Sequence, residues 1–153
     1  MENTIHNIAV ISFPRTCSKT LAKLLAEKHN KIPAYGVLHK PEYLGKNEYD
    51  IREVVFGQKH ILHGHWHSLN KLDTDVYDFI KENYTIVSSH RDRRLVYQSL
   101  AKIIGQADIN SMFERLLLET EAEKRKWNVL EHYSIEGDEI YTIQQPDPKS
   151  ILV

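Results

Sequence analysis

One stretch of the sequence decides the fold: Ile8-Ala-Val-Ile-Ser-Phe-Pro-Arg-Thr-Cys-Ser-Lys-Thr-Leu-Ala-Lys-Leu-Leu-Ala26. Its first residues form a short apolar run rich in β-branched side chains, which predicts a buried strand. From Leu21 onward, apolar residues recur at helical spacing, which predicts an amphipathic helix. The turn between them carries small hydroxyl residues and two cations, Arg15 and Lys19. Because the helix directs its free N–H groups and its positive dipole end into this turn, the stretch predicts an anion site, most often a phosphate site.

Length and composition predict a single globular domain over residues 1–153, with a loosely held tail from about residue 144. Of the 153 residues, 41% are hydrophobic and 27% are charged, which is enough apolar content for one core. The formal net charge is -1. This charge gives no global electrostatic reason to bind nucleic acid or a membrane surface, so any anion site must be local.

Cysteine usage and hydropathy predict a cytoplasmic protein. Cys17 is the only cysteine, which excludes an intrachain disulfide and fits a reducing compartment. No apolar run approaches the roughly 20 residues that a membrane-spanning helix needs. The first residues, from Met1 to His6, lack the basic and apolar regions of a secretory signal.

The remaining pattern alternates strands with helices. Strands are predicted over about 5–12, 59–63, 84–89, 129–135 and 139–143, with a short one near 35–38, and helices over about 18–29, 47–56, 74–83, 91–104 and 111–126. Gly64 is expected to break its strand, and Ser111 with Glu114 has the spacing of a capping box. This alternation predicts an open, mostly parallel, three-layer α/β sheet of the P-loop type with helices on both faces.

Three loops should meet at the carboxyl ends of the strands, where open α/β sheets bind their ligands. These loops are residues 13–19, 63–68 and 89–94. The first loop has two interpretations. As a Walker A loop, G-x-x-x-x-G-K-[ST], it offers Lys19 and Thr20. However, Phe13 and Ser18 occupy the two glycine positions that let the backbone curl around phosphates.

The second interpretation is the phosphosulfate loop of sulfotransferases, which has the pattern aromatic-Pro-[Lys/Arg]-[Ser/Thr]-Gly-[Ser/Thr]-x. Five residues match this pattern: Phe13, Pro14, Arg15, Thr16 and Ser18. Cys17 stands in place of its glycine, and Lys19 stands in place of a commoner threonine. The missing Walker glycines favour this second interpretation.

A second signal begins at the end of the strand predicted over 84–89. Arg91 lies there, and Ser99 follows eight residues later, two turns into the next helix. This arrangement resembles the sulfotransferase element that grips the 3′-phosphate of the cofactor. Arg91 can contact phosphate oxygens in a bidentate manner while the Ser99 hydroxyl donates from the helix face. The competing interpretation is that Arg91, Arg93 and Arg94 simply pair with surface carboxylates.

A third signal is the run His63-Gly-His-Trp-His67, which follows an apolar strand. It resembles the catalytic segment of sulfotransferases, especially carbohydrate-modifying ones, in which a histidine removes the proton of the acceptor hydroxyl. We favour His65 as that base, because the ordinary pKa of histidine, about 6.5, lies near working pH. His63 is then a second active-site group or the residue that orients His65. A metal site formed by His63, His65 and His67, and solvated histidines without a role, stay open as alternatives.

Together the three loops are similar to the PAPS-dependent sulfotransferases, where PAPS is 3′-phosphoadenosine 5′-phosphosulfate. The likeness covers roughly residues 5–140. It implies transfer of a sulfuryl group from PAPS to a hydroxyl acceptor such as a carbohydrate, without a metal, and release of adenosine 3′,5′-bisphosphate. It also implies that Arg15 and Lys19 stabilise the leaving group and that His65 is the base. The cofactor-binding residues that it implies are Arg15, Thr16, Cys17, Ser18, Lys19, Thr20, Arg91 and Ser99.

The chain departs from this family in three respects. It is shorter than typical members, it has Cys17 in place of a glycine, and it lacks a counterpart of the late glycine-rich loop that covers the adenine. Two other functions therefore stay open: a small kinase or other P-loop phosphotransferase, and a non-catalytic domain that keeps the fold. The expected partners are the nucleotide donor and the acceptor, without nucleic acid or membrane, and the sequence leaves a homodimer open.

Overall fold

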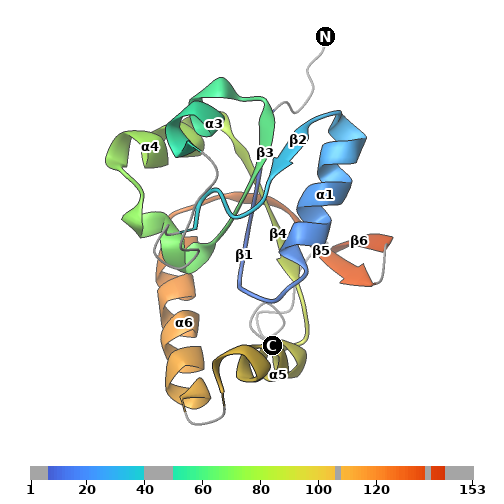
Figure 1. Ribbon diagram of the computed structural model, residues 1–153, viewed down its shortest axis with the longest axis vertical. Helices are drawn as coiled ribbons and strands as arrows, with labels where there is room; N and C mark the ends of the chain where they lie inside the picture. Colours follow the sequence, from blue (N-terminus) through green and yellow to red (C-terminus); the bar gives the residue numbers. More distant parts are fainter. Residues whose placement is uncertain (1–6, 40–49, 106–107, 137–138, 144–153) are drawn as a thin grey trace.

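A single mixed sheet forms the centre of the computed structural model, which describes residues 7–39, 50–105, 108–136 and 139–143. Its strand order is β2-β3-β1-β4-β5-β6 (Figure 1). The parallel strands are β1 (Ile8–Ser12), β2 (Ile32–Ala34), β3 (His60–His65), β4 (Thr85–His90) and β5 (Val129–Glu136). The edge strand β6 (Glu139–Ile143) runs antiparallel to β5. The prediction of an open, mostly parallel sheet is confirmed.

Helices lie on both faces of this sheet, as predicted (Figure 1). They are α1 (Ser18–His29), α3 (Ile51–Gly57), α4 (Thr74–Asn83), α5 (Arg93–Ile104) and α6 (Ile109–Lys124), with a 3-10 helix, η1 (Trp66–Lys71). Alternate residues of β1 divide between two cores: Ala9 and Ile11 pack with α3 and α4, whereas Val10 packs with α1. A third core joins Phe13, just after β1, to α5 and α6.

The helix that follows β1 has the predicted limits. It begins at Ser18 and ends at His29, and Asn30 adopts a left-handed conformation (φ 56°) that stops it. The same conformation turns the Lys31 N–H back to the Ala26 carbonyl, to which it donates over 2.8 Å. Asparagine tolerates this region better than most residues, which is why it served as a stop signal in the sequence.

The predicted break at Gly64 is wrong, because β3 continues through this residue to His65. A Cβ at Gly64 would lie 2.5 Å from the Cβ of Leu38. The Leu38 N–H also donates to the His63 carbonyl over 3.1 Å. The glycine therefore admits a neighbouring turn against the strand instead of ending the strand.

Two further boundaries differ from the prediction. The short strand lies at Ile32–Ala34, and the residues predicted to form it, 35–38, form a turn. Helix α6 begins at Ile109 after Asp108, so Ser111 lies inside the helix and no capping box forms there. Residues 47–49 of the predicted helix over 47–56 and the predicted tail from 144 lie outside the described residues.

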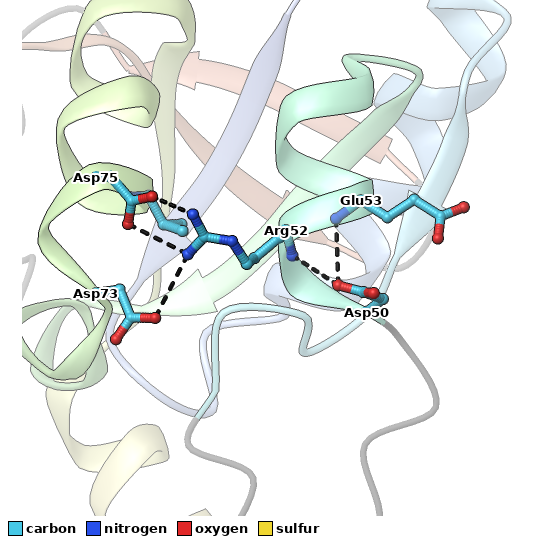
Figure 2. A network of polar contacts seen from close by, with 6 residues as sticks. Asp50, Arg52, Glu53, Asp73 and Asp75 are labelled. Atoms are coloured by element: carbon cyan, nitrogen blue, oxygen red, sulfur yellow. Dashed lines mark hydrogen bonds and ion pairs between the residues drawn. The ribbon is translucent and has the colours of Figure 1, made fainter.

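An exposed set of charges joins α3 to α4, and we call it the α3–α4 ion cluster (Figure 2). Arg52 donates to the carboxylates of Asp73 and Asp75. Asp50 accepts from the backbone N–H groups of Arg52 and Glu53 and so caps α3. Arg52 thus has two carboxylates as partners, and Asp50 has two backbone N–H donors.

Candidate functional site

The three predicted loops meet at the carboxyl ends of β1, β3 and β4. Ser12, the last residue of β1, is in register with His65, the last residue of β3. The Ser18 hydroxyl lies 2.8 Å from Nε2 of His63. From the loop after β4, Nη1 of Arg91 donates to the Arg15 carbonyl over 3.0 Å. The prediction that residues 13–19, 63–68 and 89–94 lie together is confirmed.

The loop between β1 and α1 has an unusual backbone. Arg15 (φ 65°) and Cys17 (φ 64°) are left-handed, a region that favours glycine. Phe13 and Ser18, which stand at the Walker A glycine positions, do not have a positive φ. Cys17 stands where the phosphosulfate pattern has its glycine, so the backbone follows that pattern at this residue. The Cys17 side chain does not cap α1, so the free N–H groups of the first turn stay available. This turn also contains no acidic residue that would repel an anion.

A cavity of about 330 Å³ lies beside this loop, and we call it the loop pocket. Its lining residues come from the loop, from the ends of β3 and β4 and from the turn after β2: Arg15, Cys17, Ser18, Lys19, His39, His63, His65 and Arg91. These described residues include three permanent cations and no carboxylate. The loop pocket is therefore suited to a polyanion.

A larger cavity of about 640 Å³ adjoins the loop pocket, and we call it the helix pocket. The two cavities share His39 and His65 in their linings. The rest of the helix pocket comes from Pro14, η1, α5 and α6. Two molecules bound side by side in these cavities would meet at His65 and His39.

His63 is held at both ring nitrogens. Its Nδ1 accepts from the Gly36 N–H over 2.8 Å, so the proton of the neutral ring is on Nε2 and is donated to the Ser18 hydroxyl. Burial, together with the nearby His39 and Lys19, lowers the pKa of His63 from 6.5 to about 3. With both nitrogens occupied by the protein, His63 positions Ser18 and the turn at Gly36 and has no lone pair left for a substrate.

His65 lies in a cluster of imidazole rings. Its ring centroid is 4.3 Å from that of His39 and 5.7 Å from those of His63 and His67. Burial, and then the neighbouring rings and Arg15, hold the pKa of His65 well below 6.5. The ring is therefore neutral near pH 7, which is the form that can accept a proton.

Of the two residues predicted to bind the 3′-phosphate, Arg91 lines the loop pocket and Ser99 does not. The Ser99 hydroxyl accepts from Nε of Arg15 over 2.8 Å. The alternative of simple surface pairing holds for Arg94, which pairs with Asp92 over 3.3 Å. Arg91 forms no ion pair within the described part of the chain.

Besides Ser99, two of the predicted cofactor-binding residues do not line the loop pocket. The Thr16 hydroxyl is buried, donates to the Phe13 carbonyl and lies 2.8 Å from the Ser89 hydroxyl. Thr20 lies in the first turn of α1, outside the lining. An anion in the pocket would therefore reach these residues through their backbone and not through their hydroxyl groups.

The sequence interpretation missed His39. This residue follows the turn after β2 and lines both pockets, and its Nε2 is buried without a hydrogen-bond partner among the described residues. Burial, His67 and Lys19 lower its pKa to about 4. No local pattern marks His39, because the close approach of Leu38 to Gly64 brings it to the site.

Among the described residues, neither a metal-binding cluster nor a membrane-spanning helix is found. Across the described ranges, no group of three or more His, Cys, Asp and Glu side chains could hold a metal ion. Within the same ranges, none of the helices combines the length and the apolar character needed to cross a membrane.

Comparison with known proteins identifies the fold. No protein-family model matches the chain, and no curated protein matches it. A solved structure that resembles it is shikimate kinase from Bacteroides thetaiotaomicron, with a TM-score of 0.56 and 14% identity over 84% of this chain and 85% of that chain. At this identity the likeness shows the fold alone. The chain thus shares the α/β fold of that structure, an open and mostly parallel sheet with helices on both faces, as predicted.

Proposed function

We propose that the protein transfers a sulfuryl group from PAPS to a hydroxyl acceptor. The phosphosulfate would lie in the loop pocket, against the N-terminus of α1 and the cations Arg15 and Lys19. Arg91, which lines the pocket, would hold the 3′-phosphate. Ser99 would fix the Arg15 side chain. The acceptor hydroxyl would enter from the helix pocket and reach His65.

In the proposed step, the acceptor oxygen attacks sulfur in line with the bridging oxygen of the phosphosulfate. A sulfur–oxygen bond to the acceptor forms as the bridging sulfur–oxygen bond breaks, and the electron pair of the broken bond stays on the 5′-phosphate. Arg15 and Lys19 stabilise this developing charge. His65 takes the hydroxyl proton; burial keeps its ring neutral but lowers its pKa and so makes it a weaker base than an ordinary histidine.

One observation carries the proposal: a cationic pocket without a carboxylate, among the described residues, shares His65 with a second pocket. P-loop kinases hold magnesium beside the phosphates with the help of a carboxylate, because Mg²⁺ prefers oxygen ligands. The described lining of the loop pocket offers cations and imidazoles instead. The left-handed backbone at Cys17 adds support, because it falls at the glycine of the phosphosulfate pattern.

A nucleotide-dependent kinase is the second candidate. The structural likeness to shikimate kinase supports this candidate better than the sulfotransferase. Lys19 and Thr20, at the start of α1, also have the Walker A spacing. The two candidates differ in the ligand that the loop pocket prefers.

Calorimetric titration separates these candidates. We expect adenosine 3′,5′-bisphosphate to bind at least about tenfold more tightly than ATP with magnesium, a difference of about 1.4 kcal/mol. The physical reason is that Arg91, which lines the loop pocket, would pair with a 3′-phosphate, which ATP lacks. Tighter binding of ATP with magnesium would overturn the proposal in favour of a kinase, and binding of neither nucleotide would indicate a non-catalytic domain.

A further inference from the structure

The helix pocket has a chemical character of its own. Its apolar wall comes from α5 and α6: Leu100, Ile103, Ile104, Met112 and Leu116. Ile103 is 62% exposed, although it is a large apolar residue. Such a surface is suited to a carbon skeleton, and it offers no partners for the many hydroxyl groups of a neutral sugar.

Two cations also line the helix pocket. Lys71 ends η1 and Arg115 lies in α6, and both lower the pKa of His67, which lines the same pocket. Neither forms an ion pair within the described ranges. Glu119 also lines the pocket, one helical turn beyond Arg115, and is not within ion-pairing distance of it. The described lining thus has two cations against one carboxylate, and its histidines are neutral near pH 7.

We infer that the helix pocket binds an acidic, amphipathic hydroxyl compound, with its carbon skeleton on α5 and α6 and its anionic group at Lys71 and Arg115. His65 and His39 lie where this pocket adjoins the loop pocket, so the hydroxyl group of such a compound would point toward the donor. The identification of the ligand as an acceptor rests on the proposed function. The selection of an anion rests only on the lining of the helix pocket.

The test uses matched acids and amides. The probes are 3-(4-hydroxyphenyl)propionate and ω-hydroxy fatty acids of six to ten carbons, each beside its primary amide, titrated with saturating adenosine 3′,5′-bisphosphate or ATP present. We expect at least one acid to bind about tenfold more tightly than its amide, because the amide cannot pair with the cations. Equal affinity of every acid and its amide, or no binding of any acid up to millimolar concentration, would overturn the inference.

Two variants locate the anion. Lys71→Met and Arg115→Met should each lower the preference for the acid about fivefold, without changing nucleotide affinity. Lys102→Met is the matched control, because Lys102 is an exposed cation of α5 outside the pocket lining. An unchanged preference in both pocket variants would also overturn the inference. A preference for ATP over the bisphosphate would refute the proposed function alone, because the acid preference is read separately from the nucleotide preference.

Discussion

The loop pocket and the α3–α4 ion cluster are both rich in charge, but their charges are arranged differently. In the ion cluster, Arg52 meets Asp73 and Asp75, and Asp50 caps a helix (Figure 2). In the loop pocket, by contrast, Arg15, Lys19 and Arg91 gather without a carboxylate among the described lining residues. The paired charges satisfy one another, whereas unbalanced cations indicate a site for an anion from outside.

The two regions also differ in burial. The Arg52 side chain is 49% exposed, so water screens its ion pairs and their loss costs little. At the loop pocket, His63 is almost fully buried and holds two segments together through hydrogen bonds at both nitrogens. We therefore expect changes at the pocket to alter binding, turnover and acid stability, and changes at the ion cluster to alter little.

The largest expected effect is on turnover. His65→Asn should lower the rate of sulfuryl transfer by roughly 10²- to 10⁴-fold, because it removes the proposed general base. Binding of adenosine 3′,5′-bisphosphate should stay within about twofold of the unmodified protein, as measured by calorimetry. Unchanged turnover in this variant would remove His65 from the mechanism.

The next effect is on nucleotide affinity. Arg91→Ala should weaken adenosine 3′,5′-bisphosphate binding by about 10- to 100-fold, the loss of a charged hydrogen bond of about 1.5–3 kcal/mol. Arg94→Ala is the matched control, because Arg94 pairs with Asp92 on the surface. If the two variants weaken nucleotide binding equally, the unpaired cation of the pocket has no special role in binding compared with the paired cation on the surface.

Acid should affect the two regions in different pH ranges. The pKa of His63 and of His90 is lowered to about 3, mainly by burial. The unfolded chain takes up these protons below about pH 6.5 while the folded chain does not, so stability falls as the pH drops from 6.5 toward 4. The pKa of Asp75 is lowered by its hydrogen bond to Arg52, so the ion cluster loses its contribution only at still lower pH.

Chemical denaturation at several pH values measures this difference. The free energy of unfolding should fall by a few kcal/mol between pH 7 and pH 4.5. His63→Gln should flatten this part of the curve. A stability that stays constant down to pH 4.5 would contradict the assignment of neutral, buried imidazoles.

The smallest effect is expected at the ion cluster. Arg52→Ala should lower Tm only slightly, because both partners of its ion pairs are exposed. Nucleotide binding and turnover should not change. Thermal melts and the calorimetric titration above check both parts, and a loss of nucleotide affinity would show that the cluster serves the site.

The sequence was informative wherever a local pattern had a local cause. The run from Ile8 to Ala26 predicted β1, the anion loop and the limits of α1, because periodicity and the stop at Asn30 act within a few residues. Arg91 and His65 were placed near the loop because parallel strands bring their carboxyl ends to one edge. These inferences needed no knowledge of side-chain packing.

The errors arose where contacts distant in sequence decide the structure. Gly64 resembled a strand break, but its role is to admit Leu38, which lies far from it in the chain. His39 joins the site through that same contact, and Arg115 reaches the helix pocket through the packing of α6 against η1. Ser111 had the spacing of a cap, but α6 begins earlier, at Ile109. The spacing of residues along the chain does not predict contacts of this kind.

The hydrogen bonds of His63 have a mechanical consequence. The rigid imidazole ring of His63 is hydrogen-bonded to Ser18 on one side and to Gly36 on the other. It therefore sets the distance between the start of α1 and the turn after β2. Through this one side chain, the loop that carries the cations and the turn that leads to His39 take fixed positions relative to each other.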